Sequence, residues 1–94
     1  MKKIIIANFK MNTTPSEMKG YSMTLATKTA NTKNQIIVCP PFTHLSIAKQ
    51  FLDGSKVTLG AQNVSDAEKG TYTGEISASM LKDLGVEYVI IGHS

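Results

Sequence analysis

The chain is short of the residues that build cross-linked or membrane-bound proteins. It has no tryptophan and one cysteine, Cys39, so an intramolecular disulfide is excluded and a reducing compartment is favoured. The apolar run near the start, residues 4–7, is shorter than the roughly 7–15 residues of a secretory signal. No segment approaches the roughly 20 apolar residues that cross a bilayer. We therefore expect a cytoplasmic protein without a membrane partner.

The chain also has only a small excess of one charge sign over the other. The chain has 10 basic and 7 acidic residues, which gives a net charge of +3. Because the lysines are scattered and form no run, no nucleic-acid partner is expected, although the small excess is compatible with an anionic small molecule. The two histidines and the cysteine have no metal-ligand spacing, which predicts that no metal is bound. A hydrophobic content of 41% is that of one globular domain.

Short apolar runs alternate with amphipathic segments along the chain. Strands are predicted at residues 3–7, 35–39, 56–62 and 86–91, with helices at residues 15–30, 44–52 and 78–84. The first run is apolar on both alternations, which predicts a strand covered on both faces. The order β-α-β-α-β-α-β predicts an α/β fold with a parallel sheet. It fits both the middle of a doubly wound sheet and half of a (βα)8 barrel, and the pattern alone does not separate them.

Local signals mark where the helices begin. Thr14 and Glu17 have the spacing of a capping box, Thr43 is placed to cap the second helix, and Ser77 is placed to cap the third. His44, inside the second helix, is expected on the surface. Cys39 is expected to be a small buried hydrophobic residue, because nothing near it in the sequence would lower the pKa of its thiol.

Polar residues follow the first and last strands, at the strand ends where α/β folds place their chemistry. The period of two puts Asn8 and Lys10 on one face of the first strand, and His93 follows the fourth strand. Taken singly, each has an ordinary structural explanation: a turn cap, a solvated charge and a hydrogen-bonded histidine. The loop at residues 64–75 is long for one without regular structure, so a functional or contact-making role is expected.

Four segments, in order, resemble signatures of the triosephosphate isomerase family. They are residues 7–12 (ANFKMN), 39–42 (CPPF), 60–63 with 70–77 (GAQN and GTYTGEIS), and 90–94 (IIGHS). Phe9 stands where the family more usually has tryptophan. The resemblance covers essentially the whole chain but only about four of the eight βα units of a barrel. It therefore implies the N-terminal half of a (βα)8 TIM barrel, a single incomplete domain over residues 1–94 whose remainder is not in this chain.

The resemblance also implies an activity. Enzymes of this family interconvert dihydroxyacetone phosphate and D-glyceraldehyde 3-phosphate through an enediolate, in glycolysis and gluconeogenesis, without a cofactor. His93 would be the neutral electrophile at the substrate oxygens, Lys10 would supply positive charge near the enediolate and the phosphate, and Asn8 would hold the substrate and Lys10. The family's general base, a glutamate of the sixth βα loop, is not among these residues, so residues 1–94 alone are predicted to be inactive.

The third loop implies a partner as well. In the family this loop inserts into a neighbouring subunit, and Thr73, Gly74 and Glu75 occupy the matching positions. A homodimer through residues 64–75 is therefore predicted. Two alternatives stay open at this point: a non-catalytic half-barrel that self-assembles through its open sheet edges, and another phosphate-handling (βα)8 enzyme.

Overall fold

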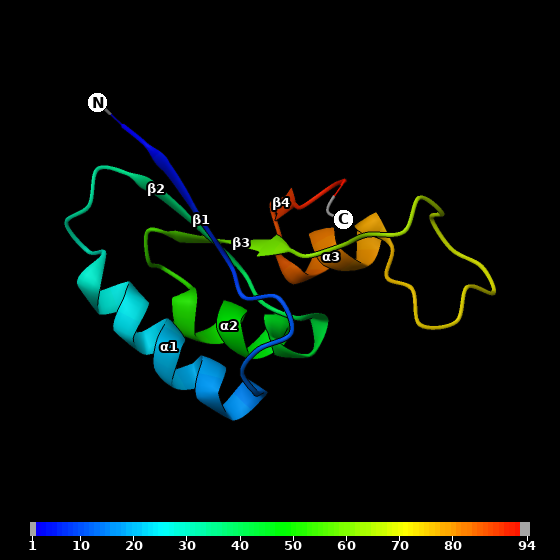
Figure 1. Ribbon diagram of the computed structural model, residues 1–94, viewed down its shortest axis with the longest axis horizontal. Coiled ribbons are helices and arrows are strands. Elements are labelled where there is room, and N and C mark those ends of the chain that lie inside the picture. The colour runs from blue at the N-terminus through cyan, green and yellow to red at the C-terminus, as the bar shows by residue number, and fades with distance from the viewer. Residues whose placement is uncertain (1, 93–94) are drawn as a thin grey trace.

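Four parallel strands alternate with helices in the computed structural model, which describes residues 2–92 (Figure 1). The elements are β1 (Ile4–Asn8), α1 (Pro15–Lys28), β2 (Gln35–Cys39), the 3-10 turn η1 (Phe42–His44), α2 (Leu45–Leu52), β3 (Val57–Ala61), α3 (Ala78–Leu84) and β4 (Tyr88–Val89). The strands lie in the sheet in chain order, β1-β2-β3-β4. A doubly wound sheet reverses its order at a switch point, so this sequential order is that of a half-barrel, and the predicted fold class is confirmed.

The helices lie together on one side of the sheet. Figure 1 shows α1 and α2 side by side below β1 and β2, and the two helices pack against each other along their length. The core between these helices and the sheet consists of apolar side chains with almost no exposure, namely Met18, Val38, Leu45, Ala48, Leu52, Val57, Leu59 and Ala61. The loop between β3 and α3 projects away from this body (Figure 1).

The starts of α1 and α3 follow from short-range chemistry, as predicted. The Thr14 hydroxyl oxygen accepts a hydrogen bond from the backbone N–H of Glu17, at 3.3 Å, and the hydroxyl donates to the Glu17 carboxylate. Ser77 caps α3 in the same way by accepting from the N–H of Met80. Gly85 ends α3 with φ 98°, a left-handed conformation that glycine adopts without a steric penalty.

The predicted start of α2 is wrong. Pro41 has an extended backbone, and the chain then enters α2 through the 3-10 turn η1, so α2 begins only at Leu45. Thr43 therefore lies inside η1 and does not cap α2. Its hydroxyl lies 2.8 Å from Nδ1 of His44. The extra turn also directs His44 inward, where its side chain is only 4% exposed, so the expectation of a surface histidine is wrong as well.

The prediction that β1 is covered on both faces is also wrong for the described residues. Ile4, Ile5 and Ile6 are 65%, 45% and 57% exposed. Within residues 2–92, β1 pairs with β2 alone and forms one edge of the sheet. A run of isoleucines predicts a strand with two apolar faces, but it does not predict which other segment packs against those faces.

The fourth strand is shorter than predicted. Regular pairing with β3 covers only Tyr88 and Val89. Two backbone hydrogen bonds continue the contact on either side, from Glu87 N–H to the Leu59 carbonyl and from Ile90 N–H to the Ala61 carbonyl. The predicted range of 86–91 therefore encloses the segment that lies along β3, although most of it is outside the regular ladder.

Candidate active site

The carboxyl ends of β1, β2 and β3 meet at one edge of the sheet, because the three strands are parallel and neighbouring. Asn8 is the last residue of β1, Cys39 is the last of β2, and Gln62 directly follows β3. Asn8, Lys10, Met11 and Gln62 line an open hollow of about 250 Å³ at this edge. Asn8 and Gln62 are therefore placed at strand ends, whereas Lys10 and Met11 belong to the turn after β1.

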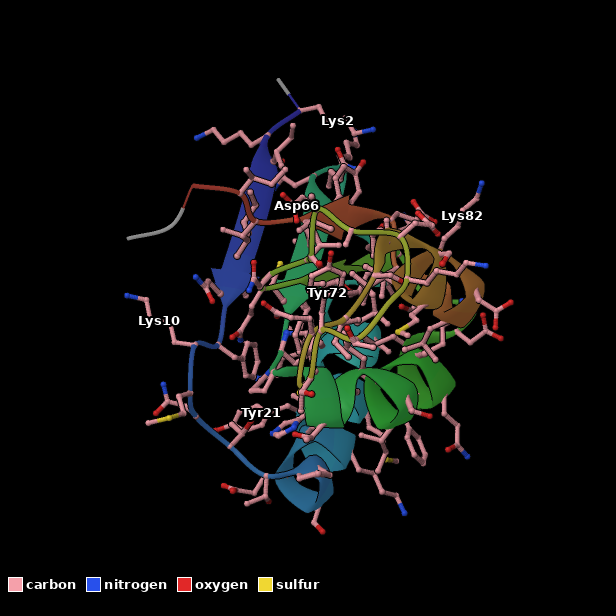
Figure 2. All side chains as sticks on the ribbon, turned by 90° about the vertical axis from the view of Figure 1, so that its right-hand side faces the viewer. Lys2, Lys10, Tyr21, Asp66, Tyr72 and Lys82 are labelled. Carbon is pink, nitrogen blue, oxygen red and sulfur yellow. The ribbon has the colours of Figure 1, made fainter. Side chains whose placement is uncertain are left out.

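Lys10, two residues after the end of β1, has an unusual backbone conformation. Its φ is 54°, in the left-handed region that residues with a side chain rarely adopt. The period-of-two argument therefore does not extend to Lys10, because β1 ends two residues earlier. The side chain is exposed, and Figure 2 shows it pointing away from the turn after β1. An exposed ammonium group on a fixed backbone suits an anionic ligand in the hollow.

The structure brings Asn8 and Lys10 together. The side-chain oxygen of Asn8 accepts a hydrogen bond from the Lys10 backbone N–H at 3.0 Å. Two residues further on, the Asn12 side-chain amide donates to the Phe9 carbonyl at 2.9 Å. Phe9 itself packs edge-on against Tyr21 of α1, with ring centres 5.9 Å apart, so the smaller aromatic ring at this position still contacts the first helix.

Gln62 completes this arrangement, and the sequence analysis did not single it out. Its side-chain nitrogen donates to the carbonyl of Lys10 at 2.8 Å and to the carbonyl of Cys39 at 2.9 Å. The N–H of Phe9 donates to the same Cys39 carbonyl at 3.1 Å. A signal was present in the sequence, because a polar residue that directly follows a buried strand lies at the same edge as Asn8.

Comparison with known proteins identifies the family. The model of the family described as "Triosephosphate isomerase" matches residues 3–94. The chain belongs to the triosephosphate isomerase family. It is 47% identical to the triosephosphate isomerase of Alkaliphilus metalliredigens over 99% of this chain and 38% of that protein. It is 45% identical to the triosephosphate isomerase of Aquifex aeolicus, over 100% of this chain and 38% of that protein. It is 46% identical to the triosephosphate isomerase of a Picosynechococcus species, over 100% of this chain and 40% of that protein. The chain thus spans less than half the length of these curated relatives.

The remaining site predictions concern His93 and three residues of the loop between β3 and α3. His93 lies outside the residues that the structure describes, so its place in a triosephosphate isomerase site stays a prediction. Thr73, Gly74 and Glu75 are all exposed, in the projecting loop between β3 and α3. The loop is closed at its base by a 2.7 Å hydrogen bond from Ser65 N–H to the Ile76 carbonyl.

The Cys39 side chain is not one of those that line the hollow. It is 1% exposed, and burial raises the pKa of its thiol, so the neutral form is favoured. The interpretation of Cys39 as a small buried hydrophobic residue is confirmed. Among residues 2–92, no three histidine, cysteine or acidic side chains lie close enough together to hold a metal ion. In the same range, no helix has the length and apolar character needed to cross a membrane.

Proposed function

We propose that the whole protein is a triosephosphate isomerase that interconverts dihydroxyacetone phosphate and D-glyceraldehyde 3-phosphate. The observation that carries the proposal is the match of essentially the entire chain to relatives that all bear this name. The proposed place of the reaction is the cytoplasm, in glycolysis and gluconeogenesis. A single buried cysteine supports a reducing compartment, and cell fractionation that puts the protein in another compartment would contradict it.

The proposed reaction moves a proton between adjacent carbons and places negative charge on the carbonyl oxygen. Groups that stabilise this charge more in the transition state than in the ground state accelerate the step. We assign Lys10 as the cation near the developing enediolate and the phosphate, Asn8 as a residue that holds the substrate and Lys10, and His93 as the neutral electrophile. The hydrogen bond from Lys10 N–H to Asn8 supports the second assignment.

A coupled assay on the whole protein tests the activity, with Lys10→Ala as the informative variant and Lys82→Ala as the control. Both lysines are exposed, but Lys82 lies on α3, away from the hollow (Figure 2). Removing one group that stabilises an oxyanion costs about 100-fold to 1,000-fold in turnover, so we expect a loss of this size for Lys10→Ala and none for Lys82→Ala. Near-normal turnover of Lys10→Ala contradicts the role of Lys10.

The same assay separates the remaining alternatives. A wild-type protein that is inactive on the triose phosphates but active on another sugar phosphate is a different phosphate-handling (βα)8 enzyme. We also propose that residues 1–94 on their own do not catalyse the reaction, because the base that the family resemblance implies lies in the sixth βα loop. Isomerase activity that co-purifies with a homogeneous 94-residue polypeptide contradicts this.

We further propose that the protein is a homodimer that associates through residues 64–75, with Thr73, Gly74 and Glu75 at the contact. The exposure of these residues on a projecting loop supports the proposal. Sedimentation of the whole protein at micromolar concentration should show a dimer. Thr73→Arg should shift it toward monomer, whereas Lys28→Arg, at an exposed position of α1, should not. A wild-type monomer at that concentration excludes the interface.

A further inference from the structure

The turn between β1 and α1 holds its backbone in a conformation that needs external support. In the described part of the chain, two residues other than glycine have positive φ, Lys10 at 54° and Thr13 at 73°, and both lie in this turn. Such conformations persist only where surrounding groups hold them, and they concentrate at functional sites. Lys10 is also the proposed catalytic cation, so the groups that fix its backbone decide where its ammonium group can reach.

Hydrogen bonds reach the Lys10 residue from both sides of its α-carbon. On the amino side, the Lys10 N–H donates to the side chain of Asn8, which is two residues away. On the carboxyl side, the Lys10 carbonyl accepts from the side chain of Gln62, which is 52 residues away in the chain. The first bond forms within one turn of backbone. The second bond ties that turn to the end of β3.

Gln62 is suited to this task because both protons of its amide nitrogen have backbone acceptors. One points to the Lys10 carbonyl at 2.8 Å and the other to the Cys39 carbonyl at 2.9 Å. The Cys39 carbonyl belongs to the end of β2, and Cys39 is almost completely buried, so it is a fixed reference point. The amide therefore fixes the position of the Lys10 peptide against the sheet itself.

We propose that Gln62 is a positioning residue for the isomerase reaction: it fixes the left-handed backbone of Lys10 and thereby aims the Lys10 ammonium group at the substrate. This inference rests on the proposed function. The proposal adds the end of β3 to the site, because Gln62 directly follows that strand. It also requires Gln62 to act through the hydrogen bonds that its side chain donates. A residue that only fills space at this edge would not need an amide.

Two substitutions separate hydrogen-bond donation from space filling. Gln62→Leu removes both donated bonds and keeps similar volume. Gln62→Glu keeps the shape, but its ionised carboxylate accepts hydrogen bonds only and would face the carbonyl oxygens of Lys10 and Cys39. When that carboxyl group is protonated it donates one bond again. Gln50→Leu is the control, because Gln50 is exposed on α2.

The experiment measures kcat/KM of the whole protein and of the three variants across a pH range. At neutral pH we expect at least a tenfold loss for Gln62→Leu and for Gln62→Glu, and a change below twofold for Gln50→Leu. As the pH falls, the ratio of Gln62→Glu to wild type should rise, whereas the ratio for Gln62→Leu should stay flat. A purely structural role would lower thermal stability without producing this pH-dependent recovery.

Crystal structures of the two Gln62 variants provide the second readout. Lys10 should leave its positive φ, or its carbonyl should turn away from the end of β3, in both. The proposal is overturned if Lys10 keeps its wild-type backbone in the Gln62→Glu structure, or if both variants retain kcat/KM within twofold of wild type. If Gln62→Leu does not fold, the isosteric Gln62→Glu decides. A wild-type protein without isomerase activity refutes the proposed function, and the position of Lys10 in the crystals then still tests Gln62.

Discussion

Gly60 in β3 is the position where the packing of the sheet leaves no room for a side chain. A Cβ atom there would lie 2.6 Å from Sγ of Cys39 and 3.2 Å from Cγ2 of Ile37. Ordinary non-bonded contacts are about 3.5–4.0 Å, so Gly60→Ala forces a shift of roughly 1 Å. Cys39 and Ile37 are 1% and 3% exposed on the neighbouring strand, so neither can move toward solvent.

The expected cost of Gly60→Ala follows from two opposing effects. Overpacking a core costs about 1–3 kcal/mol, whereas replacing a strand glycine recovers roughly 0.5–1 kcal/mol of backbone entropy. We expect the free energy of unfolding to fall by about 1–2 kcal/mol, measured by urea unfolding followed by circular dichroism. Gly20→Ala in α1 is the matched control. An added Cβ there meets nothing within 4 Å, so the helix should be stabilised by up to about 1 kcal/mol.

A double-mutant cycle isolates the contact with the sulfur. Cys39→Ala alone should cost about 1 kcal/mol, because a buried group of roughly one methylene is lost. In the double variant the methyl group added at position 60 occupies the space that the sulfur leaves, so the combined loss should be at least about 0.5 kcal/mol smaller than the sum. If Gly60→Ala is as stable as wild type, or if the two losses simply add, the close approach of β2 and β3 at Gly60 is not a constraint on this sheet.

Two further predictions concern single groups whose environment is known. Because burial raises the pKa of the Cys39 thiol above its ordinary value of 9.0, the folded protein keeps this proton to higher pH than the unfolded chain. This contribution to stability is complete below the pKa of the thiol in the unfolded chain and is lost as the pH rises. The difference in unfolding free energy between wild type and Cys39→Ala should therefore shrink toward alkaline pH. A difference that stays constant with pH contradicts the raised pKa of Cys39. Ser77→Ala removes the cap of α3 and should lower the unfolding free energy by about 1 kcal/mol, while Ser16→Ala, at an exposed position, should change it little.

The elements that the sequence predicts well are those whose ends depend on neighbouring residues. Thr14 and Ser77 each cap a helix through a bond to the backbone three residues later, and such a bond can be read from spacing alone. Thr43 has the same chemical character, but the 3-10 turn after Pro41 changes which residue comes first in α2. The orientation of His44 changes with it. The spacing of a capping residue therefore predicts the start of a helix only where no turn, such as η1, lies between that residue and the helix.

Other features that the sequence does not predict depend on segments far apart in the chain. The apolar residues 4–6 specify a strand, but their exposure depends on what lies beside β1. In the candidate site, too, some features can be predicted from nearby residues and others depend on distant ones. Asn8 and Lys10 follow from their place at a strand end, whereas the bond between Lys10 and Gln62 joins residues that meet only because β1, β2 and β3 are neighbours in one sheet.

The energies at Lys10 explain why such a distant bond matters. A residue with a side chain loses about 1–3 kcal/mol in a sparsely populated backbone conformation, and a typical hydrogen bond contributes about 0.5–1.5 kcal/mol net. At the middle of these ranges, either bond by itself, to Asn8 or to Gln62, offsets about half of the strain. Together they match the strain. The backbone position from which the Lys10 side chain extends thus depends on the register of β1, β2 and β3, and register is strongly specified wherever a face of a sheet is buried.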